Sequence, residues 1–497
     1  MYRRVGGLTL AATLSLTMVG DLSAQAQPAP PVATESGAVA SISVADLQDK
    51  IGALAHDSMR GRDTPSPELV KTAEYVAGVF EAAGLKPGLG DSYIQWFPLS
   101  IIGPGPSEAQ RLTIRGPSGT LTLILGEEFA PIPVAESASG AGSLMRIESL
   151  DGLPQAAGRV LALSVNQSNI RSVFTGFRYA MLESGASGAL LVVESDDYYE
   201  RLRSFFGGSQ MSLGEFEGLT SPVMLLPASA LPRALASAIA GEAPWAGGWS
   251  AELESTAVIS EERAMNTIGW IEGSDPELKR EYVIFTAHMD HVGVGSVVDG
   301  DSIYNGADDD ASGTAVVMEL AEAFARAQPA PRRSLVFMTV SGEEKGLLGS
   351  QWYSEHPIFP LEQTVANLNM DMVGRNWQDT IAAIGKDESS LGPLVERVAA
   401  EHPELDMVVI DDQWPDEDFY FRSDHYNFAR KGVPILFFFN GTHTDYHRPS
   451  DQPEKIQYDK TARIAKMLYY LGLQVANADG RPEWVPEAYD RVVEGGE

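Results

Sequence analysis

Three adjacent carboxylates, Asp308, Asp309 and Asp310, lie in the stretch NGADDDASGTAVVMELA at residues 305–321, directly before an apolar helical pattern. Neighbouring like charges repel one another, and burying an unpaired carboxylate is costly. A helix start explains one or two of these residues, because aspartate is a good N-cap and acidic side chains suit the first turn of a helix. The remaining carboxylate favours a cation site, and this stretch alone leaves both interpretations open.

Further acidic and histidine side chains follow strand-like apolar runs. The runs are VIFTAHMDHVG with His288 and Asp290, LVFMTVSGEE with Glu343 and Glu344, ANLNMD with Asp371, and ILFFFNGTHTDYH with His443, Asp445 and His447. Sites in open α/β sheets form at the carboxyl ends of strands. No Lys or Arg stands at these strand ends, so a metal is the natural counter-charge. The residue types fit two metal ions that share a bridging carboxylate, with one glutamate of the Glu343–Glu344 pair left free to move protons.

The elements that must position these residues alternate along the chain from residue 280 onwards. Apolar patterns predict strands at 281–288, 334–341, 364–371 and 433–440, and helices at 312–327, 346–356, 391–402 and 460–476. Such alternation predicts an α/β fold, with a mainly parallel mixed sheet sandwiched by helices. Two amphipathic helices are also predicted within 43–61 and 67–85.

The sequence pattern changes between residues 105 and 254, where short β-type runs such as RLTIRG and GALLVVES are separated by Gly/Ser turns. This pattern predicts an inserted, mostly β domain. The expected organisation is therefore a signal peptide at 1–26, a flexible linker at 27–42, a catalytic domain formed by 43–104 plus 255–478, the insertion at 105–254, and a loose acidic tail at 479–497.

Composition excludes several classes of function. The chain has 497 residues and a net charge of −32, and such an acidic surface repels nucleic acid and anionic membranes, so neither is expected as a partner. There is no cysteine, which excludes thiol catalysis, cysteine–zinc sites and iron–sulfur clusters. A metal must therefore be held by His, Asp and Glu side chains.

The first residues have the pattern of a targeting segment. Arg3 and Arg4 precede the apolar stretch 5–20, and the small residues AQA at 24–26 precede QPAPP. This pattern predicts a signal peptide cleaved after Ala26 and an exported protein that is periplasmic or extracellular. The apolar stretch is short for a membrane span, and no other span is predicted.

Five ordered motifs resemble the zinc-dependent exopeptidases of the M28 type, which include bacterial leucyl aminopeptidases and glutamate carboxypeptidases. They are HMD at 288–290, GADDDASG at 306–313, SGEE at 341–344, NMDMVG at 369–374 and DYHRPSD at 445–451. The segments RSDHYNFARKGVP at 422–434 and MRGRDTPSPE at 59–68 are also similar to that family. The resemblance covers nearly the whole chain outside 105–254 and implies two zinc ions and a peptide substrate.

The resemblance also implies a role for each matching residue. His288 and Asp371 would bind one zinc, Glu344 and His447 would bind the other, and Asp309 would bridge both. Asp290 would hold the ring of His288, and Glu343 would be the general base that takes a proton from water and passes it to the leaving amine. His291 is expected at the rim of the site or in a loop, His443 near the site without a motif position, and His425 buried and hydrogen-bonded beside it. The run Ser423, Asp424, His425 is not expected to be a triad, because consecutive residues cannot converge on one point.

Alternatives within and outside this chemistry stay open. The insertion resembles the protease-associated domain of some family members and would lie beside the site. The leading prediction is an aminopeptidase. A carboxypeptidase or dipeptidase would need a cation for the substrate carboxylate, for which Arg375 and Arg422 are candidates. Glutaminyl cyclisation with one zinc and a non-catalytic binding protein are further alternatives, against which the full ligand set and the intact Glu343 argue.

Overall fold

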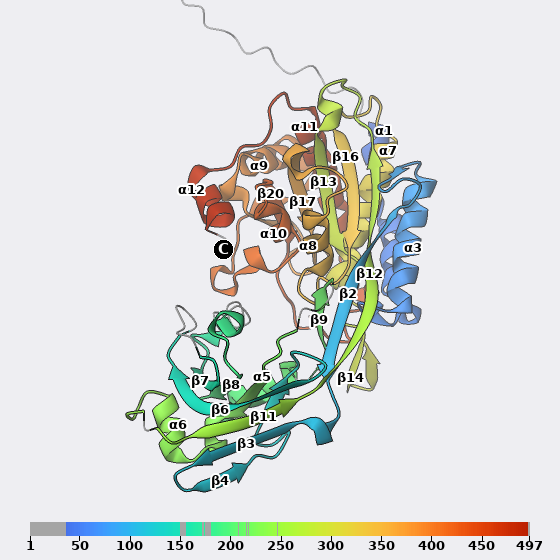
Figure 1. Ribbon diagram of the computed structural model, residues 1–497. Coiled ribbons are helices and arrows are strands. Elements are labelled where there is room, and N and C mark those ends of the chain that lie inside the picture. Colours follow the sequence, from blue (N-terminus) through green and yellow to red (C-terminus); the bar gives the residue numbers. More distant parts are fainter. Residues whose placement is uncertain are drawn as a thin grey trace, which may run out of the picture.

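Two large β-sheets organise the described part of the chain, and helices cover both faces of each (Figure 1). The computed structural model describes residues 36–495, except 150–155, 171–172, 174–179, 207, 215, 217 and 246. The predicted signal peptide at 1–26 and the first part of the predicted linker lie outside the described residues. Export therefore stays a prediction.

The larger sheet carries the motif residues. Its four central strands, β20, β17, β13 and β16, are adjacent and parallel, while β12, β2 and β9 extend one side of it antiparallel. Among the described residues its order is β19 (Val408–Ile410), β18 (Thr380–Ile384), β20 (Ile435–Phe439), β17 (Thr364–Met370), β13 (Tyr282–His288), β16 (Ser334–Val340), β12 (Ala257–Ile271), β2 (Ile94–Pro104) and β9 (Gln210–Leu213), with β1 (Lys86–Pro87) also paired to β12.

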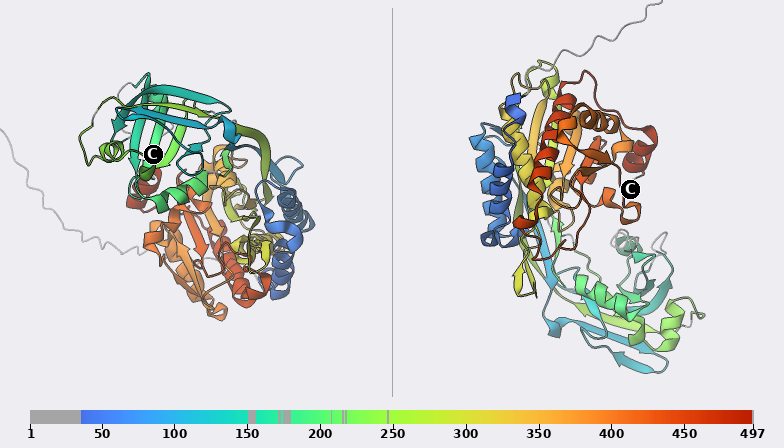
Figure 2. Two further views of the ribbon diagram at one scale, coloured as in Figure 1. Left: turned by 90° about the horizontal axis from the view of Figure 1, so that it is seen from below. Right: turned by 180° about the vertical axis from the view of Figure 1, so that it is seen from behind.

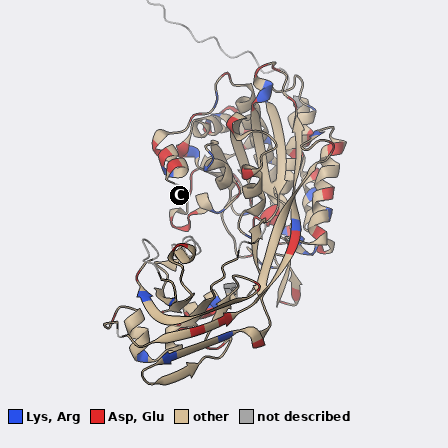
Figure 3. Cartoon of the chain, in the orientation of Figure 1, with Lys and Arg blue, Asp and Glu red and all other residues tan. Residues whose placement is uncertain are grey.

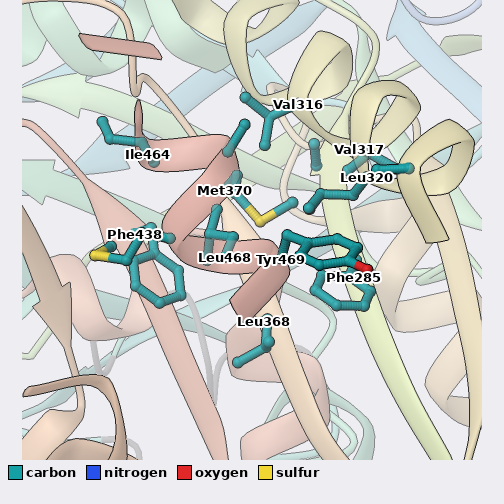
Figure 4. Close-up of a cluster of buried hydrophobic side chains, with 14 of the residues drawn as sticks. Phe285, Val316, Val317, Leu320, Leu368, Met370, Phe438, Ile464, Leu468 and Tyr469 are labelled. Carbon is teal, nitrogen blue, oxygen red and sulfur yellow. The ribbon is translucent and has the colours of Figure 1, made fainter. Parts of the chain in front are cut away.

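Alternate side chains of the central strands face two apolar cores. Phe285 of β13 packs into the first core, whereas its neighbour Ile284 packs into the second. Figure 4 shows the first core, where helices α7 and α11 cover β13, β17 and β20. That core is covered by α1 (Ser36–Val39), α2 (Val44–Leu54), α3 (Pro67–Ala82), α7 (Gly313–Ala325), α9 (Leu391–Glu401) and α11 (Tyr458–Asn477), and the second by α8 (Leu348–Glu355) and α10 (His425–Ala429). This arrangement confirms the predicted α/β fold class.

The smaller sheet is built from the β-rich stretch that was predicted as an insertion. Helix α5 (Asp196–Phe206) covers one face, and α6 (Arg233–Ile239) covers the other. Among the described residues its order is β4 (Gly119–Thr122), β3 (Arg111–Gly116), β11 (Ser250–Ser255), β6 (Ala138–Ile147), β7 (Arg159–Val165), β8 (Gly188–Val193), β10 (Val223–Pro227) and β5 (Ala130–Ile132). Strand β9 falls within the same stretch but pairs with β2 of the larger sheet, so the boundary of an inserted domain stays a prediction.

Strands β2 and β12 join the two sheets. They pair antiparallel from Ile94 opposite Thr267 to Pro104 opposite Ala257, and both extend between the larger and the smaller sheet (Figures 1 and 2). One residue, Thr256, separates β12 from β11 of the smaller sheet, and the Gln110 side chain donates to its carbonyl oxygen at 2.8 Å. Neither long strand was predicted, because the polar run at 260–263 within β12 obscures an apolar alternation.

Two segments at the ends differ from expectation. Within the predicted linker, Ala38 and Ile42 are buried in the first core, so residues 36–42 are not a flexible connection. The predicted loose tail is packed over its described part: it includes α12 (Pro486–Tyr489), Val492 is buried, and the Trp484 indole donates to the Gly432 carbonyl at 3.0 Å. Both predictions were wrong because a few apolar side chains suffice to anchor a short polar segment.

Acidic residues are spread along the chain, with examples on α3, on α12 and on the smaller sheet in Figure 3. Among the described residues, no helix combines the length and apolar character that crossing a bilayer requires.

A buried ion pair links α2 to α7. The Lys50 ammonium contacts the Glu319 carboxylate and lies 2.8 Å from Glu322, and the side chain of Glu319 is only 1% exposed. Replacing Lys50 by Met leaves that carboxylate buried and unpaired, which should lower the free energy of unfolding by about 3–5 kcal/mol. Thermal and denaturant unfolding measure the loss.

The double variant Lys50→Met/Glu319→Leu should recover most of that loss, because it removes both buried charges. The matched control is Lys86→Met, which breaks an exposed ion pair with Glu272 at 2.6 Å and should change the melting temperature little. Equal losses in Lys50→Met and Lys86→Met would show that the buried pair has no special role.

Candidate metal centre

The motif residues meet where four neighbouring parallel strands end. β13 ends at His288, β17 is followed by Asp371, and the loop after β16 carries Glu343 and Glu344. The loop after β20 reaches His447, and Asp309 lies in the turn at Ala307–Ser312 that leads into α7. The carboxyl ends of the strands therefore supply the site, as the sequence predicted.

Two groups of donor atoms form there. The first comprises His288, Glu343 and Asp371, and the second comprises His291, Asp309, Glu344 and His447; within each group the donor atoms lie within 4.8 Å of one another. Asp309 also faces the first group, because its Oδ1 is 3.2 Å from His288 Nε2 while its Oδ2 is 3.2 Å from His447 Nε2. One carboxylate thus stands between two potential cation positions.

Unpartnered polar atoms test whether a metal fits. Within the described residues, five buried atoms of the second group have no hydrogen-bond partner: both ring nitrogens of His291, Asp309 Oδ2, Glu344 Oε1 and His447 Nε2. Buried polar atoms are nearly always satisfied, so unsatisfied imidazole and carboxylate atoms that converge need an explanation. A divalent cation that accepts nitrogen and oxygen ligands provides it, and this donor set fits zinc.

The neighbours of Asp309 hold its loop. Asp451 Oδ2 accepts hydrogen bonds from the backbone amides of Asp308 and Asp309, at 2.9 and 3.2 Å. Asp308 Oδ1 accepts from the Gly374 amide, and the Asp310 carboxylate accepts from the amides of His288, Gly313 and Met372. Asp310 therefore serves the start of α7, Asp308 ties two loops together, and Asp309 is left for the donor groups.

A buried arginine organises the same loops. Arg62 has no exposed surface, and its guanidinium donates to four carbonyl oxygens, those of Met289, Leu54, Asn305 and Gly306, at 2.6–2.9 Å. Met289 and the pair Asn305–Gly306 belong to the two loops that carry His288 and Asp309. The guanidinium therefore fixes the relative position of these loops and places a positive charge beneath the carboxylates.

The charges at the site shift its pKa values in opposite directions. Burial raises the pKa of Asp309, but the His291, His288 and His447 rings outweigh that effect and hold it well below its usual range. Burial raises the pKa of the Glu343 carboxyl well above its ordinary value, and the carboxylates of Asp371 and Glu344 raise it further against the opposing effect of His288. Asp309 is thus held as an anion, and Glu343 is the carboxyl with the higher proton affinity.

The contacts of His288 and Asp290 differ partly from expectation. The His288 Nδ1 atom lies 3.2 Å from the carbonyl oxygen of Asp290 and 3.7 Å from its carboxylate, so the main chain orients the ring. The Asp290 carboxylate instead accepts from the Thr64 hydroxyl at 2.9 Å and from the Glu343 amide at 3.4 Å. The Asp290 carboxylate thus lies beside the ring, but the carbonyl oxygen is the closer contact, and the role of the carboxylate in holding the ring stays a prediction.

Two further histidines near the site, His425 and His443, lie outside both donor groups. His425 is buried, stacks on Phe437 and contacts the Tyr420 carbonyl oxygen at 2.8 Å, as expected. The Ser423 hydroxyl donates to Asp371 rather than to His425, which excludes a catalytic triad of Ser423, Asp424 and His425. His443 lies 3.2 Å from Asp308 and belongs to neither donor group.

Several site residues were not identified from the sequence. His291 was expected at the rim but is fully buried inside the second donor group. Arg62 and Asp451 lie in motifs that resemble the family, MRGRDTPSPE and DYHRPSD, and those motifs were the available signal. No pattern in the sequence showed which way the His291 ring turns.

A pocket opens beside the first donor group. It combines three acidic residues with aromatic and apolar side chains and one cation. It is lined by Asp309, Glu343, Asp371, Met372, Phe419, Arg422, Ser423, Phe437, Phe439, Thr442 and Tyr446. The site can therefore receive a molecule with an apolar group next to the carboxylates.

The comparison with known families is consistent with this geometry. Residues 266–472 match the model of peptidase family M28, and the match includes every member of both donor groups. The similarity to this family therefore covers the segment that holds the candidate metal centre.

Individual relatives match only part of the chain. A probable zinc metalloprotease of Leptosphaeria maculans is 34% identical over 141 residues, which is 28% of this chain and 30% of that protein. Aminopeptidase YwaD of Bacillus subtilis is 25% identical over 215 residues, which is 41% of this chain and 43% of that protein. The chain thus spans less than half the length of these relatives.

One solved structure supports the fold over most of the chain. The aminopeptidase from Aneurinibacillus sp. strain AM-1 aligns with a TM-score of 0.57 at 18% identity, and the alignment covers 91% of this chain and 98% of that one. At this identity the likeness establishes the fold, which agrees with the α/β prediction.

Gly306 provides a test of the loop geometry. Its φ is +59°, and an added Cβ would lie 2.6 Å from the His291 ring and closer still to the Asp309 carbonyl oxygen. Gly306→Ala should destabilise the protein by about 1–2 kcal/mol through the left-handed backbone and by about 1–3 kcal/mol more through overlap. Bound zinc, measured by elemental analysis, should fall as well.

Gly90→Ala is the matched control. Gly90 has nearly the same φ, +58°, but an added Cβ there meets no atom within 4 Å. It should show only the backbone cost and keep its zinc content. Equal melting temperatures and zinc contents in the two variants would contradict the packing argument.

Proposed function

We propose that the protein is a zinc-dependent exopeptidase that removes residues from the free amino end of peptides. The observation that carries the proposal is the pair of donor groups that share Asp309, with Glu343 beside them in an apolar pocket. The M28 match and the names of the zinc metalloprotease and aminopeptidase relatives support it.

Two zinc ions are proposed, one for each donor group. His288, Asp371 and Asp309 Oδ1 would hold one ion, and Glu344, His447 and Asp309 Oδ2 would hold the other. Zinc bound in such a pair acidifies water and polarises the carbonyl of the substrate. The low pKa of Asp309 keeps this carboxylate anionic, as a shared ligand must be.

Glu343 is proposed as the group that moves the proton. Its carboxyl lines the pocket, and its backbone amide is held by Asp290 at 3.4 Å. The raised pKa of its carboxyl suits a base that must accept a proton from water and release it to the leaving amine. Ser423 keeps Asp371 fixed beside it through a hydrogen bond of 2.9 Å.

The pocket walls support a preference for a large apolar residue at the end of the peptide. Phe419 and Phe439 pack against each other with ring centroids 4.8 Å apart, and Phe437 lies 5.2 Å from Phe439. Such a wall favours leucine- or phenylalanine-like side chains by burial of apolar surface.

Arg422 favours a second candidate, a carboxypeptidase. It lines the pocket, and its side chain is 45% exposed with a 3.3 Å contact to Glu417, so its charge can meet a substrate carboxylate. Arg375 does not compete for this role, because it is 2.8 Å from Asp445 and only 16% exposed.

The smaller sheet is proposed to act as a protease-associated-like domain that shapes access for peptides. Support comes from its position at the end of β2 and β12 and from its continuity with the larger sheet through Thr256. No catalytic group is assigned to it.

Two variants test the assigned roles. Glu343→Gln should lower kcat by about 10²–10⁴-fold while zinc content stays unchanged, because it removes the proton carrier and not a ligand. Asp309→Asn should weaken the binding of both ions, because it alters the shared ligand. Activity assays and zinc titrations measure the two effects, and full activity in Glu343→Gln would exclude the proposed base.

The choice of substrate end has a direct test. One mixed-sequence peptide, free and N-acetylated, is digested with and without a chelator and followed by mass spectrometry. Stepwise loss from the free amino end, blocked by acetylation and by chelator, is the expected result. Loss from the carboxyl end of both peptides would replace the aminopeptidase with the carboxypeptidase.

A further inference from the structure

His291 occupies a position that the proposed function does not explain. It lies three residues beyond the end of β13, its side chain has no exposed surface, and its amide donates to the Arg62 carbonyl at 3.3 Å. Within the described part of the chain, neither ring nitrogen has a hydrogen-bond partner. A buried imidazole with a free lone pair is a group for which a ligand must be sought.

The ring nitrogen Nδ1 points at the second donor group. It lies 2.7 Å from Glu344 Oε1 and 3.7 Å from Asp309 Oδ2. On the other side of the same group, His447 Nε2 lies 3.0 Å from Glu344 Oε2 and 3.2 Å from Asp309 Oδ2. Although the contact of His291 with Glu344 is short, it lacks hydrogen-bond geometry, since both atoms remain unpartnered among the described residues.

These separations match a tetrahedral ion. Nitrogen and oxygen ligands at 2.0–2.1 Å from zinc lie about 3.3 Å from each other at tetrahedral angles. The four distances from His291 Nδ1 and His447 Nε2 to the carboxylate oxygens of Asp309 and Glu344 range from 2.7 to 3.7 Å and so include 3.3 Å. The rings of His291 and His447 are also 5.6 Å apart and inclined at 72°, so they approach from different directions.

The surroundings hold the ring in this orientation. An added Cβ on Gly306 would lie 2.6 Å from the His291 Cδ2 and Cγ atoms, so the loop before Asp309 packs directly against the ring. Arg62 binds the Gly306 carbonyl at 2.9 Å and thereby fixes that loop. The ring is therefore confined by the same contacts that place Asp309.

We infer that His291 is a fourth protein ligand of the metal at the second donor group. This inference rests on the metal site of the proposed function. The two ions then differ. His291, Asp309, Glu344 and His447 enclose one with four donors, whereas His288, Asp309 and Asp371 give the other three, since the proposed function keeps Glu343 of the first donor group as the base and not as a ligand. Four protein ligands close a zinc site, and three leave a position open for water or substrate.

The consequence is unequal retention of the two ions. The ion at the four-donor position should bind more tightly and should remain when a chelator has removed the other. The three-donor ion, next to Glu343 and the pocket, should be the exchangeable one on which activity depends.

The test is a zinc titration of the full chain in competition with a chromophoric chelator. The wild-type protein should bind two ions in two resolved steps. In His291→Ala the zinc affinity of the tighter step should fall by at least about 100-fold, because removing a residue that only hydrogen-bonds a metal ligand already lowers metal affinity by about 10–100-fold. The weaker step should change by less than about threefold, and the metal-free protein should melt near the wild-type temperature.

His443→Asn is the matched control, because the side chain of His443 is also only 4% exposed but faces Asp308 and not a donor group. It should weaken the tighter step by less than about tenfold. Equal losses in the two variants, or unchanged affinities in His291→Ala, would overturn the inference. A wild-type protein that binds no zinc would overturn the proposed function together with it, which is a distinct outcome.

A second measurement needs no variant. Wild-type protein loaded with one equivalent of zinc is examined by X-ray absorption, which counts imidazole ligands from their multiple scattering. Two imidazoles per zinc, from His291 and His447, are expected at the tighter position. One imidazole would overturn the inference even if His291→Ala failed to fold.

Discussion

The burial of many carboxylates at one edge of a sheet is the constraint on which the rest of the structure depends. Asp290, Asp308, Asp310, Asp371 and Asp451 are all buried near Asp309. The chain satisfies most of them with its own donors: backbone amides serve Asp308, Asp310 and Asp451, and hydroxyl groups serve Asp290 and Asp371. Asp309 and Glu344 face imidazoles instead, and Asp371 Oδ1 also lies 3.5 Å from His288 Nε2. The hydrogen-bond network thus separates the structural carboxylates from those that are left for the candidate metal centre.

Much of this arrangement follows from the sequence. The central strands and helices have regular apolar patterns, and in a parallel sheet the ends of such strands must converge. The convergence of His288, Glu343, Glu344, Asp371 and His447 could therefore be predicted from the sequence. Asp309 is different: the choice of the middle carboxylate came from the family resemblance, and the structure supplies the reason, since its neighbours are committed to backbone amides.

Other features depend on contacts that no local pattern encodes. The buried His291 ring packs against Gly306, whose carbonyl oxygen Arg62 binds, and Arg62 is distant from both in sequence. The pairing of β9 with β2 and the packing of the tail likewise depend on partners far along the chain. In β12 the polar run at 260–263 breaks the alternation by which a half-buried strand is recognised.

The single residue Thr256 between β11 and β12 has a mechanical meaning. Two sheets joined by a long loop can rotate relative to one another. Here a strand passes from one sheet into the other almost without interruption, and the Gln110 side chain donates a hydrogen bond to the Thr256 carbonyl oxygen at the connection. The paired β2 and β12 then form a continuous connection, so any bending between the two sheets must distort the backbone hydrogen bonds of this pair. A force applied to the smaller sheet is transmitted to the strand beside β16, whose following loop carries Glu343 and Glu344.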